Sequence, residues 1–399
     1  MPNATIARIL AAWSMMIVIA GCTSSPAATQ SRSVASSDAP AAAATSGASS
    51  ASLAPASDSG GITNAWIGPP ADITKLPIGT SKVSLTEATV GGLYSCDGGN
   101  PNGGGAEVVG SWADEAAGTW DLSQKVVVQG TVSWPMASYS ETLTSSTREI
   151  TSNGLPVGNV TGTFPISPDD PAYAYDHNAN HIAEGALTTS LPLHPVAAAS
   201  PTCLGKGPVG ILKNGVSVFA PLDERNRDAV VYETQDQCDG HPQQSSMYHY
   251  HDIPSCIRDA AAGESTVVGF ANDGFPIVVE RDAQGDLPTN ADLDECHGRT
   301  SPIKLDGSVV TMYHYSATYE FPYFIGCFRG TPSSAGQSPA APGLTAIAAR
   351  LGVTEHELAD AIAAGDVETA AELLGTTPEE MANKLGVTVA DIKAFIAAQ

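Results

Sequence analysis

Short runs of β-branched residues separated by turn residues dominate the middle of the chain. Residues 125–134 (KVVVQGTVSW) and 265–279 (STVVGFANDGFPIVV) are of this kind, and an Asn-Asp-Gly turn signal divides the second run. Residues 98–105 (GGNPNGGG) predict a surface loop. No long amphipathic helix pattern precedes residue 343. The patterning therefore predicts a mainly β body over residues 61–330.

A helical pattern follows the Gly-, Ser- and Pro-rich segment 331–342, which predicts a linker. Thr354, Thr377 and Thr388 each stand three residues before an acid, the spacing of a capping box, and a Leu-Gly pair precedes each of them. The apolar residues at helical spacing are Leu358, Ile362, Leu373, Met381, Leu385, Ile392 and Phe395. Residues 343–399 therefore predict a small all-α bundle, which would act as a spacer or contact a protein partner.

The N-terminal segment has the layout of an export signal. Arg8 precedes an apolar run over residues 11–20, and small residues then lead to Cys22. This order predicts a lipoprotein signal peptide over residues 1–21 and acylation of Cys22, which would anchor the chain in a lipid bilayer. An ordinary cleaved signal with an unrelated cysteine is the alternative. The apolar run is shorter than the roughly 20 residues of a membrane-spanning helix. Thr23, the residue after Cys22, favours placement of the lipoprotein in the outer membrane of the cell envelope.

Composition describes the next segment and restricts the partners. Residues 22–60 are almost entirely Ala, Ser, Thr, Pro and Gly. They contain too few large apolar side chains to offset the entropy of ordering, so they predict a disordered tether.

The net charge of −24 argues against a nucleic-acid partner, because phosphates would be repelled. The same charge suits a solvated exported protein or one that attracts cations.

The body contains an internal duplication. Asn214 lies 24 residues before Cys238, and Asn272 lies 24 residues before Cys296. Each copy then continues to Met-Tyr-His-Tyr and ends with a further cysteine. The order predicts two related units that pack face to face.

The cysteines other than Cys22 form an even set, which in an exported chain predicts disulfides rather than a catalytic thiol. The duplication favours the bridges Cys238–Cys256 and Cys296–Cys327, one in each unit. Elimination then leaves Cys96–Cys203, although other pairings remain open.

The first copy alternates tyrosine and histidine. On a strand, His249 and His251 would share one face, with Tyr248 and Tyr250 on the other. Two imidazoles placed in this way can bind one metal ion, and imidazole donors suit copper, zinc or nickel. In the alternative interpretation the motif serves packing and the histidines only satisfy hydrogen bonds.

A third ligand must come from elsewhere in the chain. His314 is the counterpart of His249 in the second copy, where Tyr313 and Tyr315 flank it, and pseudo-symmetric packing would bring it close. His241 and His297 follow or adjoin the repeated cysteines and are the next candidates.

Residues 280–295 (ERDAQGDLPTNADLDE) are rich in oxygen donors and raise the question of a calcium site. The candidate carboxylates are those of Asp282, Asp286, Asp292 and Asp294. Their spacing departs from the helix–loop–helix calcium loop, so an acidic solvated loop is the alternative. Phosphate-binding loops, nucleophile elbows and His-Glu-x-x-His pairs are absent from the sequence.

Taken together and in order, several motifs resemble those of the YHYH-domain family of exported proteins. They are SNGLP, GTFP, GILKNGVSVFAP, CDGHP, YHYH, GFANDGFPIV, DLDECHGR and FPYFIGCFRG, and they extend over about residues 145–330. The resemblance implies no established reaction. The second copy departs from the motif, because Ser316 stands where a second histidine would be, so the first copy is the better candidate site.

These observations favour a cell-envelope lipoprotein that binds a transition metal through the histidines of the YHYH motif. The alternative is a non-catalytic structural module, or one that binds glycan through its tyrosines and Trp134. An enzymatic role would need an open coordination position and a nearby base, and the sequence indicates neither.

Overall fold

The computed structural model describes residues 62–333, except 102, 104, 105 and 107, and residues 348–396 with gaps at 349–350, 355–356, 359–360, 363 and 386–388. The signal segment, Cys22, the tether, most of the linker and Thr388 lie outside the described residues. Within them, no helix is long and apolar enough to cross a membrane.

An eight-stranded sheet forms the centre of the body, in the order β12-β13-β11-β10-β14-β15-β17-β16. Its strands are β10 (Pro208–Leu212), β11 (Ser217–Phe219), β12 (Gly240–Pro242), β13 (Tyr248–Tyr250), β14 (Ser265–Ala271), β15 (Pro276–Glu280), β16 (Gly298–Leu305) and β17 (Ser308–Ser316). The fold is mainly β, as predicted. The run 265–279 forms the hairpin β14–β15, with the turn at Asn-Asp-Gly.

The two sequence copies form the two halves of this sheet. Strands β10 to β13 build one half and β14 to β17 the other, and β10 pairs antiparallel with β14 at the centre. In each half the second strand pairs parallel with the fourth, and the third pairs antiparallel with the fourth. The prediction of face-to-face packing is therefore wrong. The units join edge to edge, because pairing β10 with β14 satisfies backbone groups that would otherwise be exposed strand edges.

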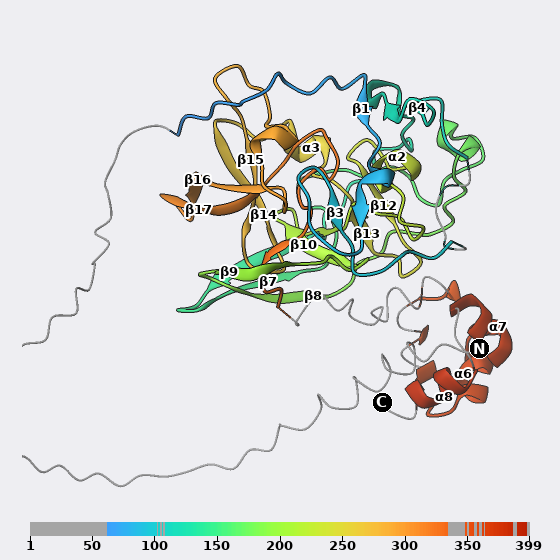
Figure 1. The fold of residues 1–399 in the computed structure, drawn as a ribbon. Coiled ribbons are helices and arrows are strands. Elements are labelled where there is room, and N and C mark those ends of the chain that lie inside the picture. The colour runs from blue at the N-terminus through green and yellow to red at the C-terminus, as the bar shows by residue number, and fades with distance from the viewer. Residues whose placement is uncertain are drawn as a thin grey trace, which may run out of the picture. The chain divides into compact units, whose positions relative to one another are not determined.

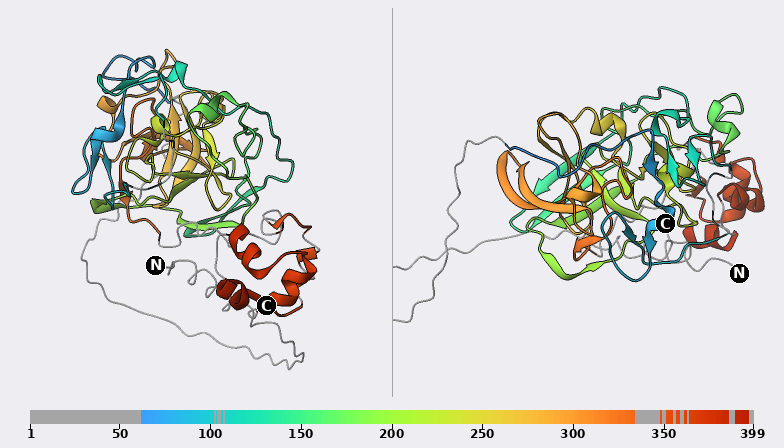
Figure 2. Two further views of the ribbon diagram at one scale, coloured as in Figure 1. Left: turned by 90° about the vertical axis from the view of Figure 1, so that its right-hand side faces the viewer. Right: turned by 45° about the horizontal axis from the view of Figure 1, so that its top comes forward.

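This arrangement places the two copies of the Tyr-His-Tyr motif far apart. Strand β13 lies near one edge of the sheet and β17 near the other. Figure 1 shows β12 and β13 on the opposite side of the body from β16 and β17, and the orange β16–β17 hairpin is seen from another direction in the right panel of Figure 2.

Both halves need a glycine at the same register position. Gly240 pairs with Tyr250 and Gly298 with Tyr315. A Cβ added to Gly240 would lie 2.2 Å from the Tyr248 ring, and one added to Gly298 would lie 2.4 Å from the backbone oxygen of His314 and the Tyr313 hydroxyl. The first tyrosine of each motif therefore crosses its neighbouring strand where only glycine leaves room.

A smaller sheet of β6 (Tyr139–Leu143), β7 (Thr147–Ser152) and β8 (Leu187–Pro192) packs against the large one. Ile150 and Leu191 form a buried cluster with Ile211 of β10 and Phe270 of β14. In Figure 1 strands β7 and β8 run along one side of β10.

The remaining elements of the body are short. The strands are β1 (Leu76–Pro77), β2 (Val83–Ser84), β3 (Leu93–Tyr94), β4 (Ala113–Asp114), β5 (Thr119–Trp120), β9 (Ala197–Thr202) and β18 (Phe328–Gly330). The helices are α2 (Ala229–Tyr232), α3 (Ser255–Arg258) and the 3₁₀ turns η1 (Gly79–Lys82), η2 (Leu122–Gln124), η3 (Pro171–Ala174) and η4 (Asn290–Asp292). The strand predicted over residues 125–134 is not formed. Val128 and Val132 make only isolated bridges, and Gly130 between them has φ 134°.

The disulfides pair as predicted: Cys96–Cys203, Cys238–Cys256 and Cys296–Cys327. The second of these closes the half that carries β13, and the third closes the half that carries β17. Three disulfides indicate a protein that resides outside the cytoplasm, where thiols are not kept reduced.

The C-terminal module is helical, as predicted. Its helices include α6 (Val367–Leu373), α7 (Pro378–Leu385) and α8 (Val389–Ile396). Thr354 and Glu357 form the predicted capping box, and the Thr377 hydroxyl accepts the backbone N–H of Glu380 at 3.2 Å. The buried core of the module consists of Ala348, Leu351, Leu358, Ala361, Val367, Ala370, Ala371, Met381, Ala382, Ile392 and Ile396. Leu373 is instead 60% exposed.

Candidate metal centre

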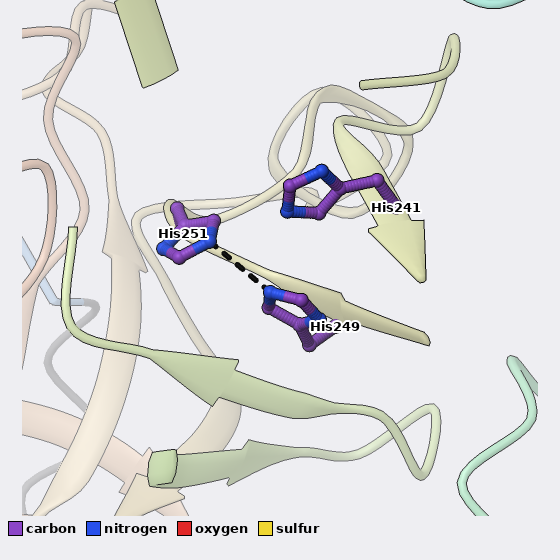
Figure 3. A group of neighbouring side chains, drawn as sticks. All are labelled: His241, His249 and His251. Carbon is purple, nitrogen blue, oxygen red and sulfur yellow. Dashed lines mark hydrogen bonds between the residues drawn. The ribbon is translucent and has the colours of Figure 1, made fainter. Parts of the chain in front are cut away.

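Strands β12 and β13 bring three histidines to one place. His241 on β12 lies directly opposite His249 on β13, so their side chains are cross-strand neighbours on one face. His251 follows β13 and points to the same side as His249, two residues away. Figure 3 shows the three rings turned toward a common point. One ligand atom from each ring lies within 4.8 Å of the other two, which makes this a group that could hold a metal ion.

Glu233, the residue that ends α2, adds a carboxylate to the group. The Nε2 atoms of His249 and His251 are 3.1 Å apart, and Glu233 Oε2 lies 3.2 Å from His251 Nε2. The same oxygen is 3.4 Å from His241 Nε2. Metal–nitrogen bonds of about 2.0–2.1 Å in a tetrahedral zinc site place neighbouring ligand atoms about 3.3 Å apart. The three distances therefore match edges of such a tetrahedron.

Backbone carbonyls orient two of the imidazoles. His251 Nδ1 lies 2.7 Å from the carbonyl oxygen of Ala220, and His249 Nδ1 lies 3.4 Å from that of Met247. A carbonyl oxygen only accepts, so each Nδ1 donates and, in the neutral ring, Nε2 carries a lone pair. Two lone pairs that face each other at 3.1 Å need a proton or a cation between them. Backbone contacts of this kind commonly fix metal-binding histidines.

Burial favours neutral imidazoles at two of the three positions. Burial, together with the neighbouring histidines, lowers the pKa of His241 and of His249 well below the ordinary value. Burial also acts to lower the pKa of His251, but the hydrogen bond and charge of Glu233 outweigh it and raise that pKa. Neutral imidazole is the form that binds metals, so two of the three rings need no deprotonation at neutral pH.

Buried polar atoms at the centre lack hydrogen-bond partners when the imidazoles are neutral. Among the described residues, these atoms are Glu233 Oε2 and both ring nitrogens of His241. An unsatisfied buried polar atom costs about 1–3 kcal/mol. A bound cation would offset this cost at Glu233 Oε2 and at His241 Nε2.

The three histidines and Glu233 line a cleft of about 610 Å³. Its other lining residues are mostly polar: Asn100, Asp176, Asn178, Asn180, Lys206, Phe219, Leu222, Asp223, Glu224, Pro242, Gln243, Gln244 and Ser245. The centre is therefore buried but lies on the wall of a space that reaches solvent.

The structure does not bring His314 and His297 to this group. Five strand steps separate β13 from β17, or about 24 Å at roughly 4.8 Å a step. His314 Nε2 lies 3.1 Å from Glu280 Oε2, and His297 Nε2 lies 3.0 Å from the Thr318 hydroxyl. Burial lowers the pKa of His297 to about 3. The expectation that His314 would approach the first copy fails because the two units share one sheet.

The tyrosines of both motifs point into the protein. The Tyr248 hydroxyl donates to Asp236 at 2.9 Å, and that of Tyr250 accepts the side-chain amide of Asn214 at 2.9 Å. In the second copy the hydroxyls donate to carboxylates: Tyr313 to Asp294 at 3.0 Å and Tyr315 to Asp273 at 2.6 Å. Tyr248, Tyr250 and Tyr315 are at most 1% exposed. Their burial argues against the interpretation in which these rings contact a glycan.

Three of the four acids considered for calcium accept backbone hydrogen bonds. Asp282 accepts the backbone N–H groups of Gln284 and Asp286, both at 2.9 Å. Asp292 accepts from Ile67 and Thr289, and Asp294 accepts from Cys296 and Gly298. Within the described part of the chain, the three histidines are the group of His, Cys, Asp or Glu side chains that could hold a metal. These four aspartates are not brought together.

Glu233 was not among the candidates from sequence. It stands eight residues before His241, and nothing in its spacing distinguishes it from the chain's other acids. Only the short helix α2, which directs the chain back toward β12, brings its carboxylate to the imidazoles.

The fold and site define a disulfide-bonded β protein with a histidine-rich centre beside a cleft. Residues 188–289 match the family model described as YHYH protein, so this chain carries a YHYH domain, as the sequence motifs indicated. The matched segment contains His241, His249 and His251 and ends before His314. No curated protein and no solved structure matches the chain.

Proposed function

We propose that this protein binds one transition metal ion, zinc or copper, through His241, His249 and His251, with Glu233 as an additional oxygen donor. The observation that carries the proposal is the set of 3.1, 3.2 and 3.4 Å separations among the Nε2 and Oε2 atoms. They match three of the six edges of a tetrahedral site, which favours zinc, while imidazole donors also suit copper.

We further propose that the ion is bound in the cell envelope, where the protein would store, deliver or sense it. The disulfides support a location outside the cytoplasm, and the sequence around Cys22 supports a lipid anchor. The C-terminal helices are a candidate surface for a protein partner, since Leu373 exposes an apolar side chain there.

Metal content tests the proposal. The full chain would be produced with its own export signal, assayed for bound metals, stripped with a chelator and titrated with Zn(II), Cu(II) and Ca(II). We expect one equivalent of zinc or copper and no calcium at the same concentration. The variant His249→Ala/His251→Ala should lose the ion.

The chain offers a matched control for this variant. His177 and His181 are exposed, so His177→Ala/His181→Ala removes the same number of imidazoles from the surface. This control should bind like the wild type. No ion above background in the folded wild-type protein, or equal loss in both variants, would overturn the proposal.

A further inference from the structure

The cleft beside the histidines is more than a route for the ion. We infer that it is a binding site for a small, uncharged ligand with carbonyl, hydroxyl or amine donors, which reaches the ion from the cleft as a fifth ligand or in place of Glu233. The inference rests on the proposed function, because the ion would form part of the ligand's site.

The cleft borders directly on the proposed ion site. Each of the four donor side chains lines the cleft, so a small molecule in that space can reach the centre. A volume of about 610 Å³ is within the range of small-molecule sites. A metal that an added ligand can reach from such a space differs from the metal of a closed structural site.

One wall of the cleft is built by an extended segment that alternates its side chains. Asp176, Asn178 and Asn180 line the cleft, whereas His177 and His181 are exposed. The Asn178 amide donates to the carbonyl of Pro242 at 3.0 Å, next to His241. Asp176 accepts the Thr234 hydroxyl at 2.7 Å, next to Glu233. The wall is therefore tied to the same backbone that carries the metal donors.

The side chains that line the cleft indicate which kind of ligand it can bind. Carboxamides on the walls supply both donors and acceptors, while Phe219 and Leu222 are the apolar side chains among the lining residues apart from Pro242. These groups can hydrogen-bond a ligand that carries several oxygen or nitrogen atoms.

The charged side chains that line the cleft further restrict the class of ligand. Asp223 is neutralised by Arg227, 2.7 Å away. Asp176, Glu224 and Glu233 also line the cleft, and Lys206, the lysine among its lining residues, lies 3.7 Å from Asp97 Oδ1. The carboxylates would weaken the attraction of the bound ion for an anionic ligand, because like charges repel. A neutral ligand avoids this repulsion.

The test uses the protein loaded with Co(II), whose visible spectrum reports added ligands. Imidazole serves as the neutral probe and azide as the anionic probe. We expect imidazole to change the spectrum at millimolar concentration. Azide should bind about tenfold more tightly to Asp176→Asn/Glu224→Gln than to the wild type, while the affinity for imidazole changes far less.

A second variant tests the route of entry. Ser245 is exposed at the rim of the cleft, so Ser245→Trp should weaken imidazole binding several-fold and leave Co(II) binding intact. Gln284→Trp, exposed on a loop that does not line the cleft, is the control and should behave as the wild type.

The outcomes separate this inference from the proposed function. If Co(II) binds but neither probe alters its spectrum, the cleft inference is overturned and the metal centre stands as a closed site. Equal azide affinity in the wild type and the charge variant would overturn the preference for uncharged ligands. Failure of Co(II), Zn(II) and Cu(II) to bind would refute the proposed function itself.

Discussion

The two halves of the large sheet have the same strand order and the same register but different residues at two of three equivalent positions. His241 pairs with His249 in the first half, and Arg299 pairs with His314 in the second. Two residues beyond these central histidines stand His251 and Ser316 respectively. One scaffold therefore presents three imidazoles at one edge and a guanidinium, an imidazole and a hydroxyl at the other.

The second half places a permanent cation beside its carboxylate. Glu280, at the end of β15, accepts from Arg299 at 3.0 Å and from Ser316 at 2.8 Å, and its Oε2 lies 3.1 Å from His314 Nε2. The side chains of Glu280 and His314 are 0% exposed. The guanidinium supplies a permanent positive charge that stays with the protein. In the first half the carboxylate of Glu233 contacts imidazoles instead, and the buried ammonium of Lys125 acts on it through charge while hydrogen-bonding Val230 and Gln235. We therefore assign the metal to that half alone.

The comparison predicts that the second half can be converted into a metal site. Arg299→His/Ser316→His restores the imidazole set of the first half around Glu280. We expect a second equivalent of Zn(II) with a dissociation constant of about 1 µM, which corresponds to about 8 kcal/mol of binding free energy. Calorimetric titration measures the stoichiometry. A folded variant that still binds a single equivalent would show that strand register and residue type do not explain the difference.

Removal of the carboxylate should destabilise the second half. Glu280→Gln leaves Arg299 and His314 without their buried anion, and breaking a buried ion pair costs about 3–5 kcal/mol. Because Arg299 is 22% exposed, we expect a loss near the lower end, about 3 kcal/mol, in urea unfolding. Glu87→Gln, at an exposed position, is the control and should stay within about 0.5 kcal/mol of the wild type. A similar small effect for both would mean that the buried network does not stabilise the fold.

The same carboxylate should make stability depend on pH. Burial acts to raise the pKa of Glu280, but the hydrogen bond and charge of His314, with those of Arg299, outweigh it and hold the pKa at about 2, below 4.5. The stabilisation is present above pH 4.5 and is lost as the pH falls toward 2. The shift corresponds to at most about 3 kcal/mol.

Unfolding of the wild type and of Glu280→Gln at pH 6 and pH 3 isolates this contribution from those of other acids. The difference in free energy of unfolding between the two proteins should shrink at pH 3. An equal difference at both pH values would exclude Glu280 as its source.

Smaller effects should distinguish the tyrosines of the two motifs. Tyr315→Phe removes a donor from the buried carboxylate of Asp273, whereas Tyr250→Phe removes an acceptor from the neutral amide of Asn214. We expect the free energy of unfolding to fall by about 2 kcal/mol in Tyr315→Phe and by about 1 kcal/mol in Tyr250→Phe. Metal affinity should be unchanged in Tyr250→Phe, since this ring lies on the opposite face of β13 from His249. Weaker metal binding in this variant would contradict a purely structural role for the tyrosines.

Local patterns predicted much of this molecule. The β-branched runs indicated a β body, the Thr-acid spacing indicated the C-terminal helices, and the alternation in β13 correctly predicted that His249 and His251 share a face. His241 was a candidate because it follows a repeated cysteine. These features depend on residues close together in the sequence.

Features that depend on the pairing of strands distant in sequence could not be predicted from local patterns. The duplication indicated two units, but not that β10 would pair with β14 and keep His314 about 24 Å from β13. Glu233 and Glu280 illustrate the same limit. They reach equivalent sites from unrelated positions, a helix end and a strand end, and no spacing rule identifies either of them.

The most direct test of the central claim is anomalous X-ray scattering from crystals of the zinc- or copper-loaded protein, recorded on both sides of the metal's absorption edge. We predict one strong anomalous peak between His241, His249 and His251, within bonding distance of Glu233, and none beside His314 and Arg299. A peak at the second half, equal peaks at both halves, or none at the three histidines in metal-saturated crystals would contradict the assignment.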